Sequence, residues 1–337
     1  MTIISNKNLL NPKESKEDEE LEVGLRPVVF DEYVGQERVK KNLQVCIRSA
    51  QKRGEVVDHV LLYGPPGLGK TTLANIVAKE MGGFLRVTSG PAITRAGDLA
   101  AILTNLKKGD LLFVDEIHRL SRVVEEMLYA AMEDFAVDLT LGKGPGAKVV
   151  RLDIQPFTLM GATTKLANLS APLRDRFGIV ERLDYYDDKE IERVLANSAR
   201  KLKIVLSDNS LHRIAVSSRG VPRIANRLLK RVRDFVVIQN EKKTEEEMVS
   251  LALESLGIDE QGLDWLDREI LTVMIEKFGG NPVGLKTLAA ATGEDLQTIE
   301  EVCEPYMLRL GLIERTVKGR KATRKALEVM GKIRKKE

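Results

Sequence analysis

Residues 64–71 read Gly64-Pro65-Pro66-Gly67-Leu68-Gly69-Lys70-Thr71, which is the pattern G-x-x-x-x-G-K-S/T of a phosphate-binding loop. A short apolar run at 59–63 precedes the loop, and a helical pattern from Thr72 through Ala78 follows it. This order of strand, glycine-rich loop and helix lets backbone N–H groups converge on a phosphate at a helix N-terminus. The sequence therefore predicts a nucleotide-binding site in an α/β domain with a parallel sheet.

The residue types around this loop predict the binding of ATP and Mg²⁺. Lys70 reaches the β- and γ-phosphates in such loops, and the hydroxyl of Thr71 binds the metal. A second apolar run, 111–114, is followed by Asp115 and Glu116, 45 residues after Lys70. Parallel strands bring such residues to the same edge of the sheet. We expect Asp115 to hold the Mg²⁺ shell and Glu116 to polarise the attacking water.

A third apolar run, 157–162, ends in the hydroxyls of Thr163 and Thr164. A hydroxyl at this edge can hydrogen-bond the attacking water or the γ-phosphate, although threonine after a strand is also a common helix cap. The segment 173–177 then places Arg174 and Arg176 around an acid. Two interpretations stay open for this segment: a surface ion pair of little energetic weight, or an arginine finger that acts in ATP hydrolysis.

Two alternating runs within about 136–153 flank the turn Gly142-Lys143-Gly144-Pro145-Gly146 and predict a β-hairpin inserted into the α/β domain. Such a hairpin is either a docking or substrate-gripping element or a surface loop without a role. From residue 187 to 257 the pattern is wholly helical, which predicts a small second domain. Within it, Pro222 suits the first position of a helix, so Arg223 lies in a first turn, where a cation needs a nearby anion such as a nucleotide phosphate.

The remainder of the chain, 258–337, has the pattern of a winged helix. Helices are expected near Leu263–Phe278, Leu285–Ala291 and Leu296–Leu310, followed by two short strands around a turn at 317–319. Arg315 and Arg320 flank this turn, where a wing meets a DNA duplex. A winged helix that binds protein instead is the alternative. From Lys318 onward the chain has nine Lys or Arg and two Glu, a net charge of +7, which suits a solvated tail or an anionic partner.

Length and composition agree with a soluble protein of several domains, because 337 residues are too many for one core and 43% of them are hydrophobic. The predicted division is a mobile arm (1–20), a large ATPase domain (21–186), a helical lid (187–257) and the winged helix (258–337). No apolar run reaches the roughly 18 residues of a membrane span. With no signal-peptide segment and only two cysteines, far apart, we expect a cytoplasmic protein without a disulfide framework.

With these residues in hand, nearly the whole chain resembles the RuvB family of AAA+ ATPases, the hexameric motors of Holliday-junction branch migration. The resemblance extends from the phosphate-binding loop to the C-terminal domain. It is carried by the segments 58–62, 64–72, 115–120, 161–164, 172–178, 222–227 and 282–285. The loop and the acid pair are common to AAA+ proteins, whereas the residues after Glu116 and the C-terminal domain are more specific to this family.

The resemblance implies roles for further residues. For the nucleotide it implies contacts from Leu25, Arg26, Gly67, Gly69, Lys70, Thr71, Thr72, Glu133, Asp134, Phe135, Tyr186 and Arg223. Thr164 matches the first sensor of hydrolysis, Arg223 the second, and Arg176 the finger given to the ATP of a neighbouring subunit. Arg315 and Arg320 match DNA-contacting arginines.

The resemblance also implies an assembly. Six copies form a ring on duplex DNA and four-way junctions, RuvA docks on the hairpin around Gly144, and the resolvase RuvC joins the complex. The chain departs from the family pattern at Lys165, at Val221 and at Val317-Lys318 in the wing, so the wing turn is looser. Two other functions stay open: a clamp-loader subunit, and an ATP-switched winged-helix regulator that binds DNA without motor activity.

Overall fold

The computed structural model describes residues 10–11, 24–141, 148–238 and 244–333. These fall into two compact units, one within residues 14–186 and the other formed by residues 10–11 with the chain from Asp187 onward. The first unit is the large domain, and the second contains the lid and the winged helix. The arm predicted at 1–20 and the hairpin turn at 142–146 lie almost wholly outside the described residues.

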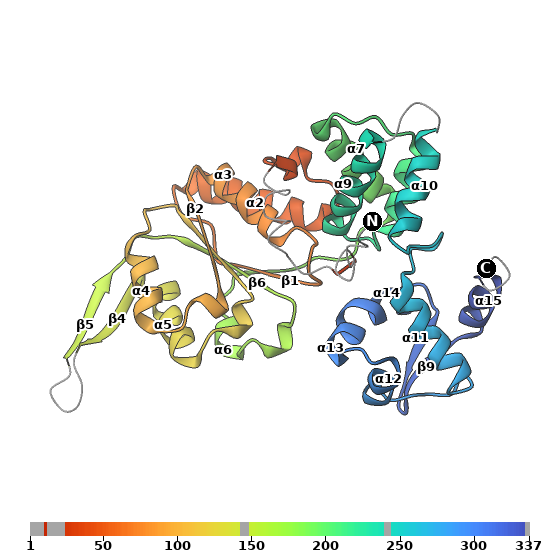
Figure 1. Ribbon diagram of the computed structural model, residues 1–337. Helices are drawn as coiled ribbons and strands as arrows, with labels where there is room; N and C mark the ends of the chain where they lie inside the picture. Colours follow the sequence, from red (N-terminus) through yellow and green to blue (C-terminus); the bar gives the residue numbers. More distant parts are fainter. Residues whose placement is uncertain (1–9, 12–23, 142–147, 239–243, 334–337) are drawn as a thin grey trace. The chain divides into compact units, whose positions relative to one another are not determined.

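The large domain is built on a five-stranded sheet whose neighbouring strands are all parallel (Figure 1). The strand order is β2-β3-β6-β1-β7. The strands are β1 (Val60–Tyr63), β2 (Leu85–Ser89), β3 (Leu111–Asp115), β6 (Thr158–Thr163) and β7 (Ile179–Arg182). The central strands are buried because helices cover both faces of the sheet, as parallel sheets require. The apolar runs identified in the sequence correspond to three of these strands, β1, β3 and β6.

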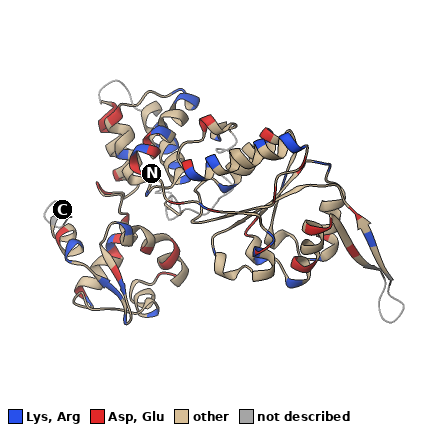
Figure 2. Cartoon of the chain, turned by 180° about the vertical axis from the view of Figure 1, so that it is seen from behind, with Lys and Arg blue, Asp and Glu red and all other residues tan. Residues whose placement is uncertain are grey.

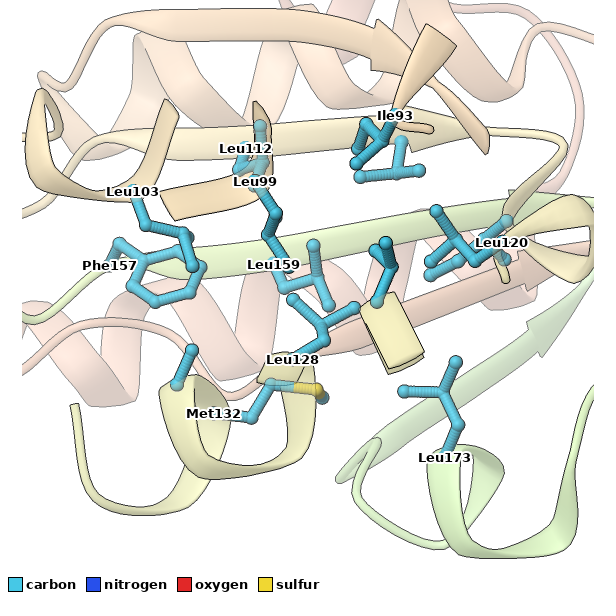
Figure 3. Packing of buried hydrophobic residues seen from close by; sticks show 14 of the residues in the cluster. Ile93, Leu99, Leu103, Leu112, Leu120, Leu128, Met132, Phe157, Leu159 and Leu173 are labelled. Carbon is cyan, nitrogen blue, oxygen red and sulfur yellow. The ribbon is translucent and has the colours of Figure 1, made fainter. Parts of the chain in front are cut away.

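Helices α2 and α3 lie on one face of the sheet, and α4, α5 and α6 lie on the other (Figure 1). Their bounds are α2 (Glu37–Arg53), α3 (Lys70–Met81), α4 (Ala96–Thr104), α5 (Arg122–Glu133) and α6 (Ala171–Arg174), with short 3-10 turns at Phe30–Glu32, Gly90–Ala92, Ile117–Arg119 and Leu166–Asn168. Helix α3 begins at Lys70, two residues earlier than the sequence pattern indicated. Figure 3 shows Leu112 and Leu159 of the sheet packed against Leu99 of α4 and Leu128 of α5, all fully buried.

The predicted hairpin is present between β3 and β6. Its strands β4 (Ala136–Leu141) and β5 (Lys148–Asp153) pair antiparallel and form a sheet of their own. The hairpin projects from the body of the large domain (Figure 1). Val149 and Val150 on β5 are both exposed, and as successive strand residues they lie on opposite faces of the hairpin.

The lid consists of α7 (Asp188–Leu202), α8 (Asp208–Ser217), α9 (Pro222–Ile238) and α10 (Glu245–Ser255). Asp187, Ser207 and Thr244 cap the N-termini of α7, α8 and α10 with their side-chain oxygens. These caps follow the preference of short polar residues for unpaired helical N–H groups. The wholly helical pattern predicted for this part of the chain is confirmed.

The winged helix contains α11 (Trp265–Glu276), α12 (Leu285–Thr292), α13 (Leu296–Thr298), α14 (Glu304–Arg309), α15 (Arg324–Ile333) and the antiparallel strands β8 (Ile313–Thr316) and β9 (Gly319–Ala322). The third helix was expected to be continuous, but a π-helical segment (Ile299–Cys303) separates α13 from α14. The basic stretch after Lys318 was expected to be a tail or a site for an anionic partner. Most of its described part is β9 and α15, whose Ala326, Val329 and Met330 are buried in the core, so the solvated tail is wrong for these residues.

Lid and winged helix meet through buried charged groups. The side chain of Arg219, 4% exposed, extends from the turn between α8 and α9, and its Nη2 lies 2.6 Å from Oδ2 of the fully buried Asp267 and 3.3 Å from Asp264. The ring of Tyr306 packs against the Arg219 guanidinium, with 4.9 Å from ring centroid to Cζ. Arg309 Nη1 donates to the Arg219 carbonyl at 2.7 Å. We name these five residues the charged junction.

No helix among the described residues is long and apolar enough to cross a membrane. Both cysteines are free: Cys46 lies on α2 and Cys303 is buried at the end of the π segment.

Candidate functional site

The phosphate-binding loop lies between β1 and α3, as its sequence requires. Gly67 and Gly69 have φ angles of 77° and 96°, a left-handed conformation that glycine adopts without strain. A Cβ atom at Gly69 would lie 2.7 Å from the hydroxyl of Tyr33. Glycine at this position is therefore needed both for the turn and for the close packing of Tyr33 behind the loop.

Lys70 is buried, 8% exposed, at the first position of α3. Its Nζ donates to the carbonyls of Gly64 at 2.9 Å and Pro65 at 2.8 Å, so the ammonium group lies within the curve of the loop. Thr71 and the buried Thr72 follow in the first turn of the same helix. A cation, helical N–H groups and a hydroxyl are thus gathered where a polyphosphate binds.

Two tyrosines of the large domain support the loop. Tyr33 donates to the Leu68 carbonyl at 3.2 Å, and Tyr186 donates to the Tyr33 hydroxyl at 3.1 Å. Leu25 is buried, and Arg26 follows it directly. Both Tyr33 and Tyr186 thus lie beside the loop, and the sequence analysis predicted no contact between Tyr33 and the loop. This contact is visible only in three dimensions.

The acid pair lies where β3 ends. Asp115 is the last residue of the strand, and its Oδ1 accepts the N–H of Glu116 at 2.8 Å. Glu116 has a left-handed backbone (φ 47°), which turns its side chain out of the strand direction. The Glu116 carboxylate pairs with Arg119 at 2.8 Å, and both side chains are about half exposed. Arg119 was not expected to hold this acid.

The strand between β3 and β1 contributes hydroxyls. Thr163, the last residue of β6, is 1% exposed, and its Oγ1 lies 2.9 Å from His118 Nδ1 while accepting the N–H of Lys165. Thr164 follows and is exposed. Burial lowers the pKa of His118, which keeps the imidazole neutral near pH 7. The sequence analysis gave no role to His118, because its three-residue distance from Asp115 conveys no contact with β6.

Strand order explains how these groups meet. Because β6 lies between β3 and β1 and all three are parallel, their carboxyl ends bring Asp115, Thr163 and the loop after Tyr63 to one edge of the sheet. Among the described residues no three His, Cys, Asp or Glu side chains cluster as a protein-only metal cage. Mg²⁺ in such loops uses few protein oxygens together with phosphate oxygens, so the hydroxyl of Thr71 and the carboxylate of Asp115 fit it.

Arg176 lies at the opposite edge. It comes three residues before β7, whose first residue, Ile179, pairs with Val60 at the start of β1, whereas the phosphate-binding loop follows the end of β1. The Arg176 guanidinium is 3.1 Å from Glu133 and packs over the ring of Tyr129 at 5.0 Å. The ion pair considered for this segment is present between Arg174 and Asp175 at 3.7 Å, whereas Arg176 pairs with α5.

The segment Glu133-Asp134-Phe135 lies near the same edge. The carbonyl of the preceding residue, Met132, is 3.1 Å from Nε2 of His59, immediately before β1. Asp134 pairs with Arg151 of the hairpin at 2.8 Å, and Phe135 packs edge-on against Phe157. This segment is therefore not beside the phosphate-binding loop of its own chain.

Two groups of predicted residues belong to the other unit. Arg223 is the second residue of α9, as expected from Pro222. In the wing, Arg315 and Arg320 face each other across β8 and β9. Both donate to Glu304, whose side chain is 1% exposed. The hydrogen bond to Glu304 raises the pKa of Arg315.

Family comparisons agree with this arrangement over nearly the whole chain. Residues 25–183 match the Holliday junction DNA helicase RuvB P-loop domain, 186–259 the RuvB AAA lid domain, and 260–331 the RuvB C-terminal winged helix domain. The chain belongs to the RuvB family. It is therefore an AAA+ P-loop ATPase and a branch migration motor, which decides against the clamp-loader and regulator alternatives.

Individual RuvB proteins are similar in sequence and structure. The Holliday junction branch migration complex subunit RuvB of Dehalococcoides mccartyi (strain CBDB1) is 55% identical over 320 residues, which are 95% of this chain and 92% of that protein. The structure of the Thermotoga maritima RuvB Holliday junction branch migration motor is 48% identical, with a TM-score of 0.81, over 91% of this chain and 98% of that one. A variant of that RuvB gives a TM-score of 0.80 at the same identity and coverage.

Proposed function

We propose that the chain acts as one subunit of a homo-hexameric ring on duplex DNA, in which Arg176 completes the ATP site of a neighbouring subunit. The observation that carries this proposal is the position of Arg176 at the edge of the sheet away from its own phosphate-binding loop. A finger in that position serves only a site on another chain. The Glu133-Asp134-Phe135 segment, on the same edge, then faces the neighbour's nucleotide as well.

Within each site the chain's own groups divide the work of hydrolysis. Lys70 holds the β- and γ-phosphates, and Thr71 and Asp115 hold Mg²⁺, which neutralises phosphate charge when bound. Glu116 orients the attacking water once its carboxylate turns away from Arg119. Thr164 is the proposed sensor at the end of β6. Arg223 is the proposed lid residue for a phosphate, since an anion stabilises a cation in the first turn of a helix.

Two surfaces of the chain are proposed to bind partners of the motor. The hairpin β4–β5, which exposes the side chains of Val149 (67%) and Val150 (36%) on its two faces, is proposed to dock RuvA. The resolvase RuvC is proposed to act on the same complex. Arg315 and Arg320 are proposed to contact DNA phosphates, so binding is independent of sequence and weakened by salt.

Mixing two inactive variants tests the finger in trans. We expect Arg176→Ala and Lys70→Ala each to abolish ATP hydrolysis, the first by removing the finger and the second by weakening phosphate binding. When the two are mixed, a Lys70→Ala subunit supplies its intact Arg176 to the intact loop of a neighbour, so partial turnover returns. The measurement is steady-state phosphate release across mixing ratios, with DNA present.

The matched control is Arg174→Ala, because Arg174 lies in the same segment and its ion pair with Asp175 is long, at 3.7 Å, and exposed. It should retain turnover alone. If the mixture of the two inactive variants stays inactive at every ratio, although both variants assemble normally and Arg176→Ala binds an ATP analogue, a finger acting between subunits is excluded.

A further inference from the structure

Two cations of the wing share one buried acid. Arg315 on β8 and Arg320 on β9 are directly opposite in the antiparallel register, where like charges destabilise a strand pair. The Glu304 carboxylate accepts from both guanidinium groups. Figure 2 shows basic segments on the strands of the wing and acidic segments on helices of the same domain.

The contacts hold both guanidinium groups in defined orientations. Arg320 donates from Nε to Oε1 at 3.1 Å and from Nη2 to Oε2 at 3.0 Å, a two-point contact. Arg315 donates from Nε to Oε1 at 2.5 Å. The backbone of Arg320 is fixed as well, since it exchanges two hydrogen bonds with Val283 at 2.7 and 2.8 Å.

The geometry of the guanidinium group determines which N–H donors of Arg315 remain available for a ligand. The Arg315 side chain is 58% exposed, and within the described part of the chain its Nε–H is the one donor engaged. Because the guanidinium group is planar, fixing Nε–H against Glu304 also fixes the plane of the group, and it leaves the edge formed by the two Nη groups outside this contact. Two parallel N–H groups at that edge match the spacing of two phosphate oxygens.

The position of Glu304 in the chain is consistent with a functional role. It follows directly after the π segment (Ile299–Cys303), the irregular stretch inside what the sequence pattern predicted as one helix. Such segments are frequent at functional sites. An acid this deeply buried is also costly without cationic partners, so it is not a solvated charge on the surface.

We propose that Glu304 is a positioning residue that orients Arg315 and Arg320 toward the phosphates of duplex DNA. The inference rests on the proposed DNA contacts of these two arginines. The positioning role and a simple charge effect predict opposite results. If only net charge matters, removing a carboxylate beside a DNA-binding surface strengthens DNA binding. Removing a positioning residue weakens it.

The test is the affinity of the full-length protein for a fluorescent duplex, measured by anisotropy at several salt concentrations. Arg315→Ala and Glu304→Gln should each bind about tenfold more weakly, with a salt dependence lower by about one phosphate contact. Glu304→Asp, which keeps the charge, should recover part of the affinity. Arg315→Ala added to Glu304→Gln should cost little more, since both changes remove the same oriented contact.

Glu300→Gln is the matched control. Glu300 is half exposed and 3.7 Å from Arg320, so its removal changes charge without releasing either arginine and should leave affinity equal or higher. Thermal unfolding of each variant shows whether the winged helix remains folded. Unchanged or tighter binding of folded Glu304→Gln, with Arg315→Ala weakened, overturns the positioning role alone. Full DNA affinity in both Arg315→Ala and Arg320→Ala overturns the proposed contacts themselves.

Discussion

The core of the large domain and the charged junction between lid and winged helix are both buried, but they have opposite chemistry. The core consists of aliphatic and aromatic side chains such as Leu112, Leu128 and Leu159, none of them exposed. In the junction, the charged side chains of Arg219 and Asp267 are buried as deeply as the side chains of that core. An apolar contact loses little when its geometry shifts, whereas a buried ion pair loses its compensation as soon as the partners separate. The junction is therefore the more orientation-specific contact.

Removing the cation of the junction is expected to have the largest effect. At pH 8, where the Asp267 carboxyl of the original chain is ionised, Arg219→Met leaves this carboxylate buried without its cationic partner, which should cost about 3 to 5 kcal/mol in the unfolding of the second unit. Trp265, the single tryptophan, adjoins Asp264 in sequence and reports this unit by fluorescence. The measurement is urea unfolding followed by Trp265 emission.

Two comparison variants sharpen this result. Adding Asp267→Leu to Arg219→Met removes the unpaired charge and should restore most of the stability. Leu159→Ala in the large-domain core should cost about 2 to 5 kcal/mol in its own unit while leaving the Trp265 transition in place. A loss below about 1 kcal/mol in Arg219→Met contradicts the view of the junction as a paired buried charge.

The contrast also explains what sequence reasoning could reach. Apolar runs that end in glycines, acids or hydroxyls gave β1, β3 and β6 and, with them, Lys70, Asp115 and Glu116. Arg219, by contrast, is one of many basic residues in a helical region, and nothing local distinguishes it from a solvated one. Glu304 likewise lies in a helical pattern among other acids. Contacts between distant segments decide both cases, so periodicity and spacing could not predict them.

The pH dependence of the junction is expected to have the next largest effect. Burial and the neighbouring Asp264 raise the pKa of Asp267 to about 7 against the pull of Arg219, from an ordinary value near 4. Folding therefore takes up a proton between these two values, so stability is highest below the unfolded pKa and falls as pH rises toward 7. Between pH 5 and pH 6 the loss should be about 1.4 kcal/mol.

Asp267→Asn isolates this contribution, because asparagine does not titrate. The unfolding free energy of each protein is measured by Trp265 emission at pH 5 and at pH 6. The value for the original chain minus the value for the variant should decrease from pH 5 to pH 6. An equal difference at both values means that Asp267 stays ionised, with Arg219 dominating over burial.

The smallest expected effect concerns the Tyr306 hydroxyl. It donates to the Gln261 carbonyl at 2.6 Å, while the ring packs on Arg219. Burial raises the pKa of Tyr306 to about 12, so the hydroxyl remains a donor at any physiological pH. Tyr306→Phe keeps the ring and should cost about 1 kcal/mol, the net value of one hydrogen bond. The unfolding free energy is measured by the same Trp265 transition. A loss as large as that of Arg219→Met would mean that this hydroxyl, and not the ion pair, makes the main contribution to the stability of the junction.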